Sequence, residues 1–189
     1  MVIVKRLELS GFKTFAKKTV LTFDKGLNVI VGPNGSGKSN IVDAIQFVLG
    51  ELSVRTLRVK SFPDLLFNGN SEYPKARKAT VTIHLDNRDR KIPIDADDVV
   101  ITRSVGPDGS STFRVNGSKY PRNTLVEMLS MASLTGGMNI IHQGTTIRIA
   151  EYPPEERRRA VEQIIGIAEY DRKKREAEAQ LREADVNIR

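Results

Sequence analysis

The feature that most constrains this 189-residue chain is the glycine-rich run GPNGSGKS at residues 32–39. It fits the phosphate-binding pattern G-x-x-x-x-G-K-[ST] at every specified position. An apolar run at residues 27–31 precedes it and a helix-like run at residues 39–49 follows, which predicts a strand, a loop and a helix in that order. A plain surface turn of glycine and serine is the alternative, and the two flanking elements argue against it. We therefore predict that the chain binds a nucleoside triphosphate.

Each residue type in the loop has a physical reason to be there. Gly32, Gly35 and Gly37 let the backbone approach an anion closely, because a Cβ would clash or forbid the turn. The freed N–H groups and the positive end of the following helix then face the phosphates. Lys38 is predicted to reach the β and γ phosphates, and the hydroxyl of Ser39 to hold Mg²⁺.

Composition limits the class of protein. The length suits about one domain, and 39% hydrophobic with 28% charged residues describes a soluble globular chain. No apolar run approaches the roughly 20 residues of a membrane span, and no leader opens the sequence, so we expect neither a membrane nor a secreted protein. The absence of cysteine excludes disulfides and thiolate metal sites and fits a cytoplasmic setting.

The net charge of +7 is concentrated at one end of the chain. Residues 1–60 carry ten Lys/Arg against four Asp/Glu, a net of +6, whereas residues 151–189 carry nine against ten. A basic lobe around a nucleotide loop suggests that it binds a polyanion beyond the nucleotide. A solvated basic face fits the charge equally well.

The predicted fold class is α/β, with a mixed sheet and an antiparallel β meander. Strands are expected at residues 2–9 and 18–23 before the loop strand, unlike the βαβ opening of a kinase or small GTPase. Residues 79–120 alternate with period two around turns at 107–110 and 116–117, which predicts a meander attached beside the nucleotide core.

Two helices are expected in addition to a long C-terminal one. The first turns one apolar face inward, made of Ile41, Val42, Ile45, Val48 and Leu49. The second is capped by Asn123 and ends near residues 136–137.

The third helix begins at residues 153–156, where proline and acid favour a helix N-terminus. Its apolar positions alternate three and four residues apart, which favours the start of a coiled coil; they are Ile167, Tyr170, Lys174, Ala177, Leu181, Ala184 and Ile188. A lysine in the stripe weakens this prediction, and an amphipathic surface helix is the alternative. The predicted domains are residues 1–152, a nucleotide-binding lobe, and residues 153–189, a helix entering a coiled coil.

A second metal-organising acid at the end of a buried apolar strand, which a P-loop ATPase needs, is missing. The run ending in Asp86 alternates with polar residues, and the run ending in Asp95 contains Pro93. We therefore predict that the chain binds Mg-ATP but does not hydrolyse it alone. The rest of the active site is expected on another polypeptide or in a later part of a longer protein.

Five motifs together resemble one family. They are GFKTF at residues 11–15, the loop at 32–40, NIIHQG at 139–144, PEERR at 154–158 and GIAEY at 166–170. In this combination they resemble the N-terminal half of the ABC-type ATPase head of an SMC (structural maintenance of chromosomes) protein, of archaeal or bacterial type. The resemblance covers essentially the whole chain.

The resemblance implies a function and a set of partners. In that family the two ends of a long chain form the head, and the C-terminal half supplies the signature motif, the Walker B acids and a switch histidine. ATP with Mg²⁺ closes two heads and hydrolysis opens them, so that the coiled coils move around double-stranded DNA. The expected partners are the C-terminal head half, a second head, DNA and a kleisin-type subunit. The expected role is chromosome condensation and segregation at the nucleoid.

The resemblance also assigns site residues. Lys38, Gln143 and Arg58 are expected to act in catalysis, with Arg55 as the competitor of Arg58 for the phosphates. Ser39 and Gln143 are expected to hold the metal, although Thr145 stands where many relatives have an acid. The expected nucleotide-binding residues are Lys13, Thr14, Gly32, Pro33, Asn34, Gly35, Ser36, Gly37, Lys38, Ser39 and Asn40.

Three other functions are alternatives to this one. A recombination or break-repair ATPase has the same split head, but the GIAEY motif argues against it. A non-catalytic DNA-binding scaffold with a nucleotide-dependent latch is distinguished by an ATPase assay with and without a C-terminal head chain. A P-loop kinase requires a lid and an acceptor pocket, for which the sequence offers no candidate.

Overall fold

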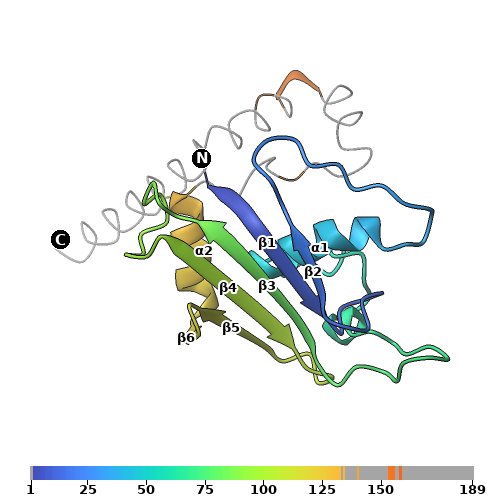
Figure 1. Cartoon of the computed structure of the whole chain (residues 1–189). Helices are drawn as coiled ribbons and strands as arrows, with labels where there is room; N and C mark the ends of the chain where they lie inside the picture. Colours follow the sequence, from blue (N-terminus) through green and yellow to red (C-terminus); the bar gives the residue numbers. More distant parts are fainter. Residues whose placement is uncertain (1, 133, 135–139, 141–152, 156–157, 159–189) are drawn as a thin grey trace. The chain divides into compact units, whose positions relative to one another are not determined.

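The computed structural model describes residues 2–132, 134, 140, 153–155 and 158 (Figure 1). The chain divides into two compact units, Met1–Leu134 and Thr135–Arg189. All the strands and helices with assigned bounds lie in the first unit, and the fold below is the fold of that unit. The predicted domain boundary at residues 152 and 153 adjoins residues outside the described part of the chain.

One six-stranded antiparallel sheet dominates the first unit (Figure 1). Its spatial order is β2, β1, β3, β4, β5 and β6. The strands are β1 (Ile3–Ser10), β2 (Thr19–Thr22), β3 (Ala79–Asp86), β4 (Asp98–Val105), β5 (Ser111–Val115) and β6 (Ser118–Tyr120). The predicted meander is therefore confirmed, but it is not a separate attachment, because β3 pairs directly with β1 and continues the same sheet.

The alternating pattern of the strands turns one face of the sheet inward. On β3, Val81, Ile83 and Leu85 are fully buried, while the polar residues between them are only partly covered. The buried face packs with helix α1 (Lys38–Val48), the short 3₁₀ helix η1 (Phe62–Leu65) and helix α2 (Arg122–Met131) into one core. The predicted turn at residues 116–117 is present, with Asn116 and Gly117 both at positive φ.

The predicted strand at residues 27–31 is wrong. These residues form no strand, and Leu27, Val29 and Val31 are 92%, 71% and 83% exposed. A β-strand exists only through pairing, and residues 27–31 pair with none of the strands of the described sheet. The parallel component that would have made the sheet mixed is therefore absent from the described sheet, and four apolar side chains are left facing solvent.

Helix α1 was predicted correctly in position but not in its buried face. Ile41 and Val48 are buried as expected, but Ala44 and Phe47 complete the face, and Val42, Ile45 and Leu49 are only partly covered. The ring of Phe47 lies 5.4 Å from that of Phe12, which orients the helix on the sheet. Asp43, which interrupts this apolar face, is also fully buried.

Helix α2 begins and ends differently from the prediction. Pro121 occupies its N-cap position and Arg122 begins it, so Asn123 lies within the first turn instead of capping it. The helix ends at Met131, before the glycines at 136–137 that lie outside the described residues. Proline suits the start of a helix because the N–H that it lacks would have no partner there.

The last turn of α1 is held by a buried arginine of β4. The Nη1 of Arg103 donates to the carbonyl oxygens of Phe47 and Glu51, each at 2.7 Å. Its guanidinium carbon lies 4.2, 4.5 and 5.2 Å from the ring centres of Phe47, Phe113 and Phe62. A cation at a helix C-terminus and over aromatic faces is stabilised by both, so Arg103 joins α1 to the sheet.

Burial lowers the pKa of Arg103 to about 9, with the nearby positive charge of Arg122 acting in the same direction and the charge of Glu51 opposing it. Arg103 is therefore still a cation at neutral pH. Arg122 adds a second tie, since its Nε and Nη2 donate to the carbonyl oxygen of Gly50 at 3.0 and 2.9 Å.

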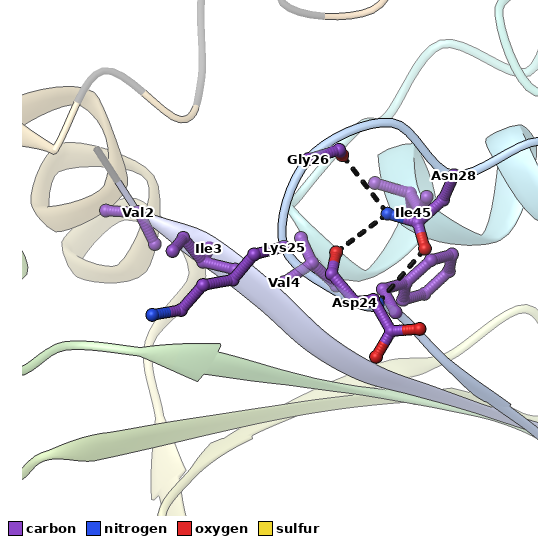
Figure 2. A pocket seen from close by; sticks show the side chains of 9 residues that line it. Val2, Ile3, Val4, Asp24, Lys25, Gly26, Asn28 and Ile45 are labelled. Atoms are coloured by element: carbon purple, nitrogen blue, oxygen red, sulfur yellow. Dashed lines mark hydrogen bonds between the residues drawn. The ribbon is translucent and has the colours of Figure 1, made fainter.

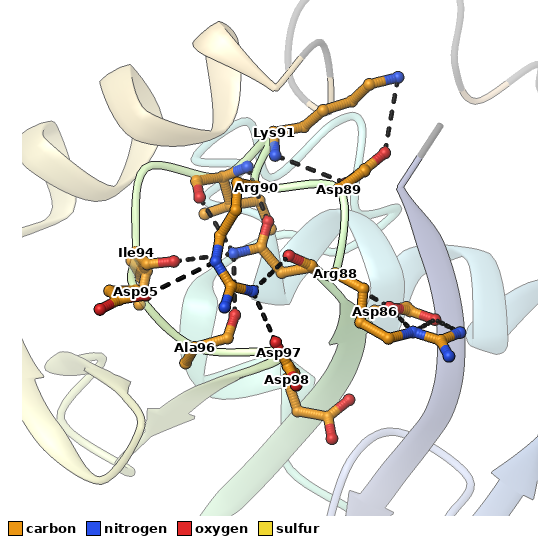
Figure 3. A network of polar contacts seen from close by, with 12 residues as sticks. Asp86, Arg88, Asp89, Arg90, Lys91, Ile94, Asp95, Ala96, Asp97 and Asp98 are labelled. Atoms are coloured by element: carbon orange, nitrogen blue, oxygen red, sulfur yellow. Dashed lines mark hydrogen bonds and ion pairs between the residues drawn. The ribbon is translucent and has the colours of Figure 1, made fainter.

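The loop between β3 and β4 is ordered by polar contacts (Figure 3). Asn87 is fully buried and its side-chain amide donates to three loop carbonyls, those of Ile92, Ile94 and Ala96. Arg90 pairs with Asp97 at 2.7 Å. Hydrogen bonds from Arg88 hold the pKa of Asp86 far below its usual range, so this carboxylate is committed to an ion pair and is not a free acid.

The C-terminal predictions fall mostly outside the described residues. Pro154, Glu155 and Arg158 are helical, in agreement with a helix beginning after Pro153. The NIIHQG motif at 139–144 apart from residue 140, and the heptad stripe at 167–188, lie outside the described part of the chain, and Gln143 with them. Within the described part, no helix has the length and apolar composition that a membrane crossing needs.

We expect Arg103→Met to lower the free energy of unfolding by about 3 kcal/mol, because it leaves the α1 carbonyls and the aromatic box without their cation. Arg114→Met is the matched control, since Arg114 lies on the adjacent strand β5 and is exposed, and it should cost less than about 0.5 kcal/mol. Urea denaturation measures both, and equal losses would contradict the role assigned to Arg103.

Candidate nucleotide site

The glycine-rich loop at residues 32–39 leads directly into α1. Gly35 and Gly37 have φ of 80° and 92°, the left-handed region that glycine tolerates. A Cβ on Gly37 would lie 2.6 Å from the Thr14 hydroxyl oxygen, so this position also requires glycine for space. The sequence prediction for these two glycines is therefore matched by their backbone geometry.

The N-terminus of α1 is open. Gly37 occupies the N-cap and provides no side-chain hydrogen bond to the first turn, and the first turn carries no acidic residue. Unpaired N–H groups at such an end attract anions. Lys38 is the first residue of the helix, and its Nζ donates to the carbonyl oxygens of Gly32 and Pro33, each at 2.6 Å. Ser39 follows and is exposed.

The GFKTF segment at residues 11–15 packs against this end of α1. The Nδ2 of Asn40 donates to the Thr14 hydroxyl at 3.0 Å, which ties the segment to the helix. Phe12 and Phe15 close a tight turn by two backbone hydrogen bonds, of 3.1 and 2.8 Å. Lys13 and Thr14 lie between them. Lys13 lies in that turn at a φ of 47°, which is uncommon for a residue with a side chain.

Asp43 binds two of the predicted site residues at once. Its Oδ2 accepts a hydrogen bond from Lys13 Nζ at 2.5 Å, and the Nε and Nη2 of Arg58 donate to its two oxygens at 3.1 and 2.6 Å. Lys13 also donates to the carbonyl oxygen of Leu57 at 2.5 Å. We call these three charged residues, Lys13, Asp43 and Arg58, the Asp43 triad.

Arg58 rather than Arg55 is the arginine that the structure brings to α1. Arg58 makes the bidentate contact with Asp43 and has a φ of 54°. Arg55 is exposed, and its carbonyl oxygen accepts the backbone N–H of Arg58 at 3.1 Å. The structure therefore brings Arg58 to α1 by a side-chain contact, and the expectation that Arg58 reaches the phosphates stays a prediction.

Sequence reasoning placed Lys13, Thr14 and Arg58 near the loop but missed Asp43, the residue that binds Lys13 and Arg58. Asp43 follows Ser39 by one helical turn and interrupts the apolar face of α1, which was the available signal. Gln143, the other predicted metal residue, lies outside the described residues.

A separate apolar pocket of about 470 Å³ lies beside α1 (Figure 2). It is lined by the start of β1, by the turn after β2 and by Ile45 of α1. The Asn28 side chain closes the turn by hydrogen bonds to Asp24 and Gly26. The exposed residues 27–31 follow this turn in the chain, so an apolar pocket and an exposed apolar segment adjoin in sequence.

Known proteins are similar to this chain in sequence and in fold. Residues 3–138 match the family described as RecF/RecN/SMC N terminal domain. A solved chain from "Structural biochemistry of ATP-driven dimerization and DNA stimulated activation of SMC ATPases" is 45% identical, with a TM-score of 0.80 over 85% of this chain and 98% of that one. The chain belongs to the SMC family. The predicted resemblance and the ABC-type head fold are therefore confirmed.

Two further SMC relatives cover nearly all of the chain. Chromosome partition protein Smc of Pyrococcus furiosus is 45% identical over 190 residues, which is 100% of this chain and 16% of that protein. The Smc head domain of Pyrococcus furiosus, with an extended coiled coil and bound to the C-terminal domain of ScpA, is 46% identical with a TM-score of 0.84, covering 99% of this chain and 48% of that one. This SMC chain thus spans about a sixth of the curated relatives it matches.

We expect Gly37→Ala to destabilise this SMC chain more than Gly26→Ala. The two glycines have nearly equal φ, 92° and 94°, so alanine costs about 1–2 kcal/mol of backbone strain at each. Only at position 37 does the new Cβ meet an atom, the Thr14 hydroxyl, whereas nothing lies within 4 Å at position 26. The clash adds about 1–3 kcal/mol, measured by urea denaturation. Equal losses of the free energy of unfolding would mean that the loop moves to relieve the clash without a cost in free energy.

Proposed function

We propose that this SMC chain is the N-terminal ATP-binding part of a chromosome-organising ATPase. One observation carries the proposal: the glycine-rich loop opens into an uncapped helix N-terminus with Lys38 at its first position. Loop N–H groups, the helix dipole and a lysine are the three features that a triphosphate needs. Thr14 and Asn40 close the site at its rim.

Mg²⁺ is expected with the nucleotide. Ser39 is exposed at the second position of α1 and would supply its hydroxyl to the ion, and Gln143 would supply a second ligand. The metal neutralises charge on the β and γ phosphates. Arg58, held by Asp43, is the arginine that we expect to reach the phosphates.

We infer that hydrolysis needs a C-terminal head half, which would cover the apolar region beside α1. The four apolar side chains of residues 27–31 and the pocket next to Ile45 form a surface rich in residues that favour β-structure. An unpaired segment of this kind invites strand addition by another polypeptide. Two buried acids of the described part, Asp86 and Asp43, are not available to polarise water, since Asp86 is paired with Arg88 and Asp43 with Lys13 and Arg58.

The wider assembly follows from family membership and charge. We expect two complete heads to sandwich ATP between them, since a related structure comes from work on ATP-driven dimerization of SMC ATPases. A kleisin-type subunit is expected because the Pyrococcus furiosus head was solved with ScpA. The charge of +7 suits contacts with DNA phosphates without sequence preference. The proposed location is the nucleoid.

Binding of Mg-ATP by this chain tests the first part of the proposal. A fluorescent ATP analogue should bind the natural chain, and Lys38→Ala should weaken binding at least about 100-fold, since charged hydrogen bonds to phosphate are worth about 1.5–3 kcal/mol each. Lys119→Ala, on the exposed strand β6, is the control and should bind like the natural chain. A natural chain that does not bind the analogue refutes the proposal.

Association with a C-terminal head half tests the second part. Val29→Asp with Val31→Asp should leave the free energy of unfolding of the isolated chain within about 0.5 kcal/mol, because both side chains are already exposed. The same pair should weaken association at least about 100-fold, measured by analytical ultracentrifugation, since two charges would be buried at the interface. Val20→Asp, also an exposed valine but on β2, is the control.

Turnover by the combined halves separates the remaining functions. We expect ATP hydrolysis by the joined head and none by this chain alone. Hydrolysis by this chain alone would contradict the inferred need for a second half. Binding without hydrolysis in the joined head, under conditions that favour head dimers, would favour the nucleotide-latched scaffold instead.

A further inference from the structure

We propose that Asp43 is a positioning residue, which holds the guanidinium of Arg58 and the amine of Lys13 at the nucleotide site. The inference rests on the proposed function and adds a residue to it. Asp43 itself would touch no phosphate. It would act only through the two cations that it binds.

The geometry of the triad connects three separate segments of the chain. Asp43 lies on α1, Lys13 comes from the turn between β1 and β2, and Arg58 comes from the turns that follow α1. Four contacts of hydrogen-bond length join them or tie them to Leu57, each between 2.5 and 3.1 Å. The three segments therefore cannot shift independently near the helix N-terminus.

The position of Asp43 aims the triad at the phosphates. Asp43 lies four residues after Ser39, and residues four apart occupy the same side of a helix with Cβ atoms about 5–6 Å apart. Lys13 is joined in sequence to Thr14, which contacts Asn40 and closes on Gly37. The triad thus lies one helical turn below the predicted metal and phosphate ligands.

Packing alone does not account for Asp43. It is fully buried among Ile41, Ala44 and Phe47, where an apolar side chain would avoid the several kcal/mol that desolvating a carboxylate costs. Both of its partners also have strained backbones, with φ of 47° at Lys13 and 54° at Arg58. Such strain gathers at functional sites, where the surrounding contacts hold a side chain in one place.

The two cations of the triad differ in what remains available to a phosphate. Lys13 is only 10% exposed, and it is bound to Asp43 and to the Leu57 carbonyl. Arg58 is 47% exposed, so part of its guanidinium stays accessible while its Nε and Nη2 face Asp43. The triad carries a net charge of +1 by count, two cations and one carboxylate, and the charge reaches solvent through Arg58.

A double-mutant cycle for Mg-ATP affinity tests the inference. Asp43→Asn keeps the shape of the side chain but removes its charge, and it should weaken binding of a fluorescent ATP analogue about 10-fold, because misplacing a positioned group by about 1 Å costs up to about 100-fold. In an Arg58→Ala background the same substitution should change the affinity less than about 2-fold, since the exposed cation that Asp43 positions is gone and Lys13 is still held by the Leu57 carbonyl. A purely structural role would weaken binding equally in both backgrounds.

Asp86→Asn is the matched control for Asp43→Asn. Asp86 is also a buried, arginine-paired aspartate, but it lies at the end of β3 and pairs with Arg88 in the neighbouring loop. Asp86→Asn should leave the ATP affinity unchanged.

If Asp43→Asn does not fold, Arg58→Lys tests the same contact with Asp43 intact. Lysine keeps the charge of Arg58 but cannot make the bidentate contact with Asp43, so this variant should also weaken binding about 10-fold.

The outcomes separate this inference from the proposed function. A natural chain that fails to bind the analogue overturns both. A natural chain that binds, together with an Asp43→Asn variant of equal or higher affinity, overturns the positioning role alone. Equal losses in the two backgrounds also overturn it. Loss of affinity that disappears without Arg58 supports it.

Discussion

Helix α1 is held by two buried charges of opposite sign, and the candidate site depends on this arrangement. In the middle of the helix, Asp43 is enclosed by Lys13 and Arg58, and at the last turn Arg103 is enclosed by three phenylalanine rings and two carbonyl oxygens. A buried ion is tolerated only when its partners are in place, so the helix is fixed at its middle and at its C-terminal end. The glycine-rich loop leads directly into α1, so the contacts that fix α1 also orient the loop.

The six strands of the sheet are paired with one another, whereas the residues that lead into the glycine-rich loop are not. The six strands form one antiparallel sheet and bury one face on α1, η1 and α2. Residues 27–31 take no part in that pairing and expose their apolar side chains. The described part of the chain therefore forms a paired sheet with a packed core, which supports the phosphate loop. It also leaves an apolar region uncovered. This division agrees with a protein that spans only part of its SMC relatives.

Local patterns predicted those parts of the structure that local physics controls. Alternation at Val81, Ile83 and Leu85 led to a one-sided strand, and Asn116–Gly117 led to a hairpin turn, because side-chain period and backbone φ act within a few residues. The expected strand at residues 27–31 failed for the opposite reason. Its residues favour β-structure, but a strand forms only where another strand offers its edge, and a propensity does not reveal that.

The sequence by itself determined the chemistry of the loop: where glycine must stand, which lysine and serine follow, and that a helix begins there. The SMC family was also readable from short motifs. Only the tertiary structure decided which distant side chains meet that helix. Lys13 and Arg58 lie 30 and 15 residues from Asp43, and the fold brings them to one carboxylate. Periodicity can mark Asp43 as an interruption of an apolar face, but only folding supplies the two cations that make its burial stable.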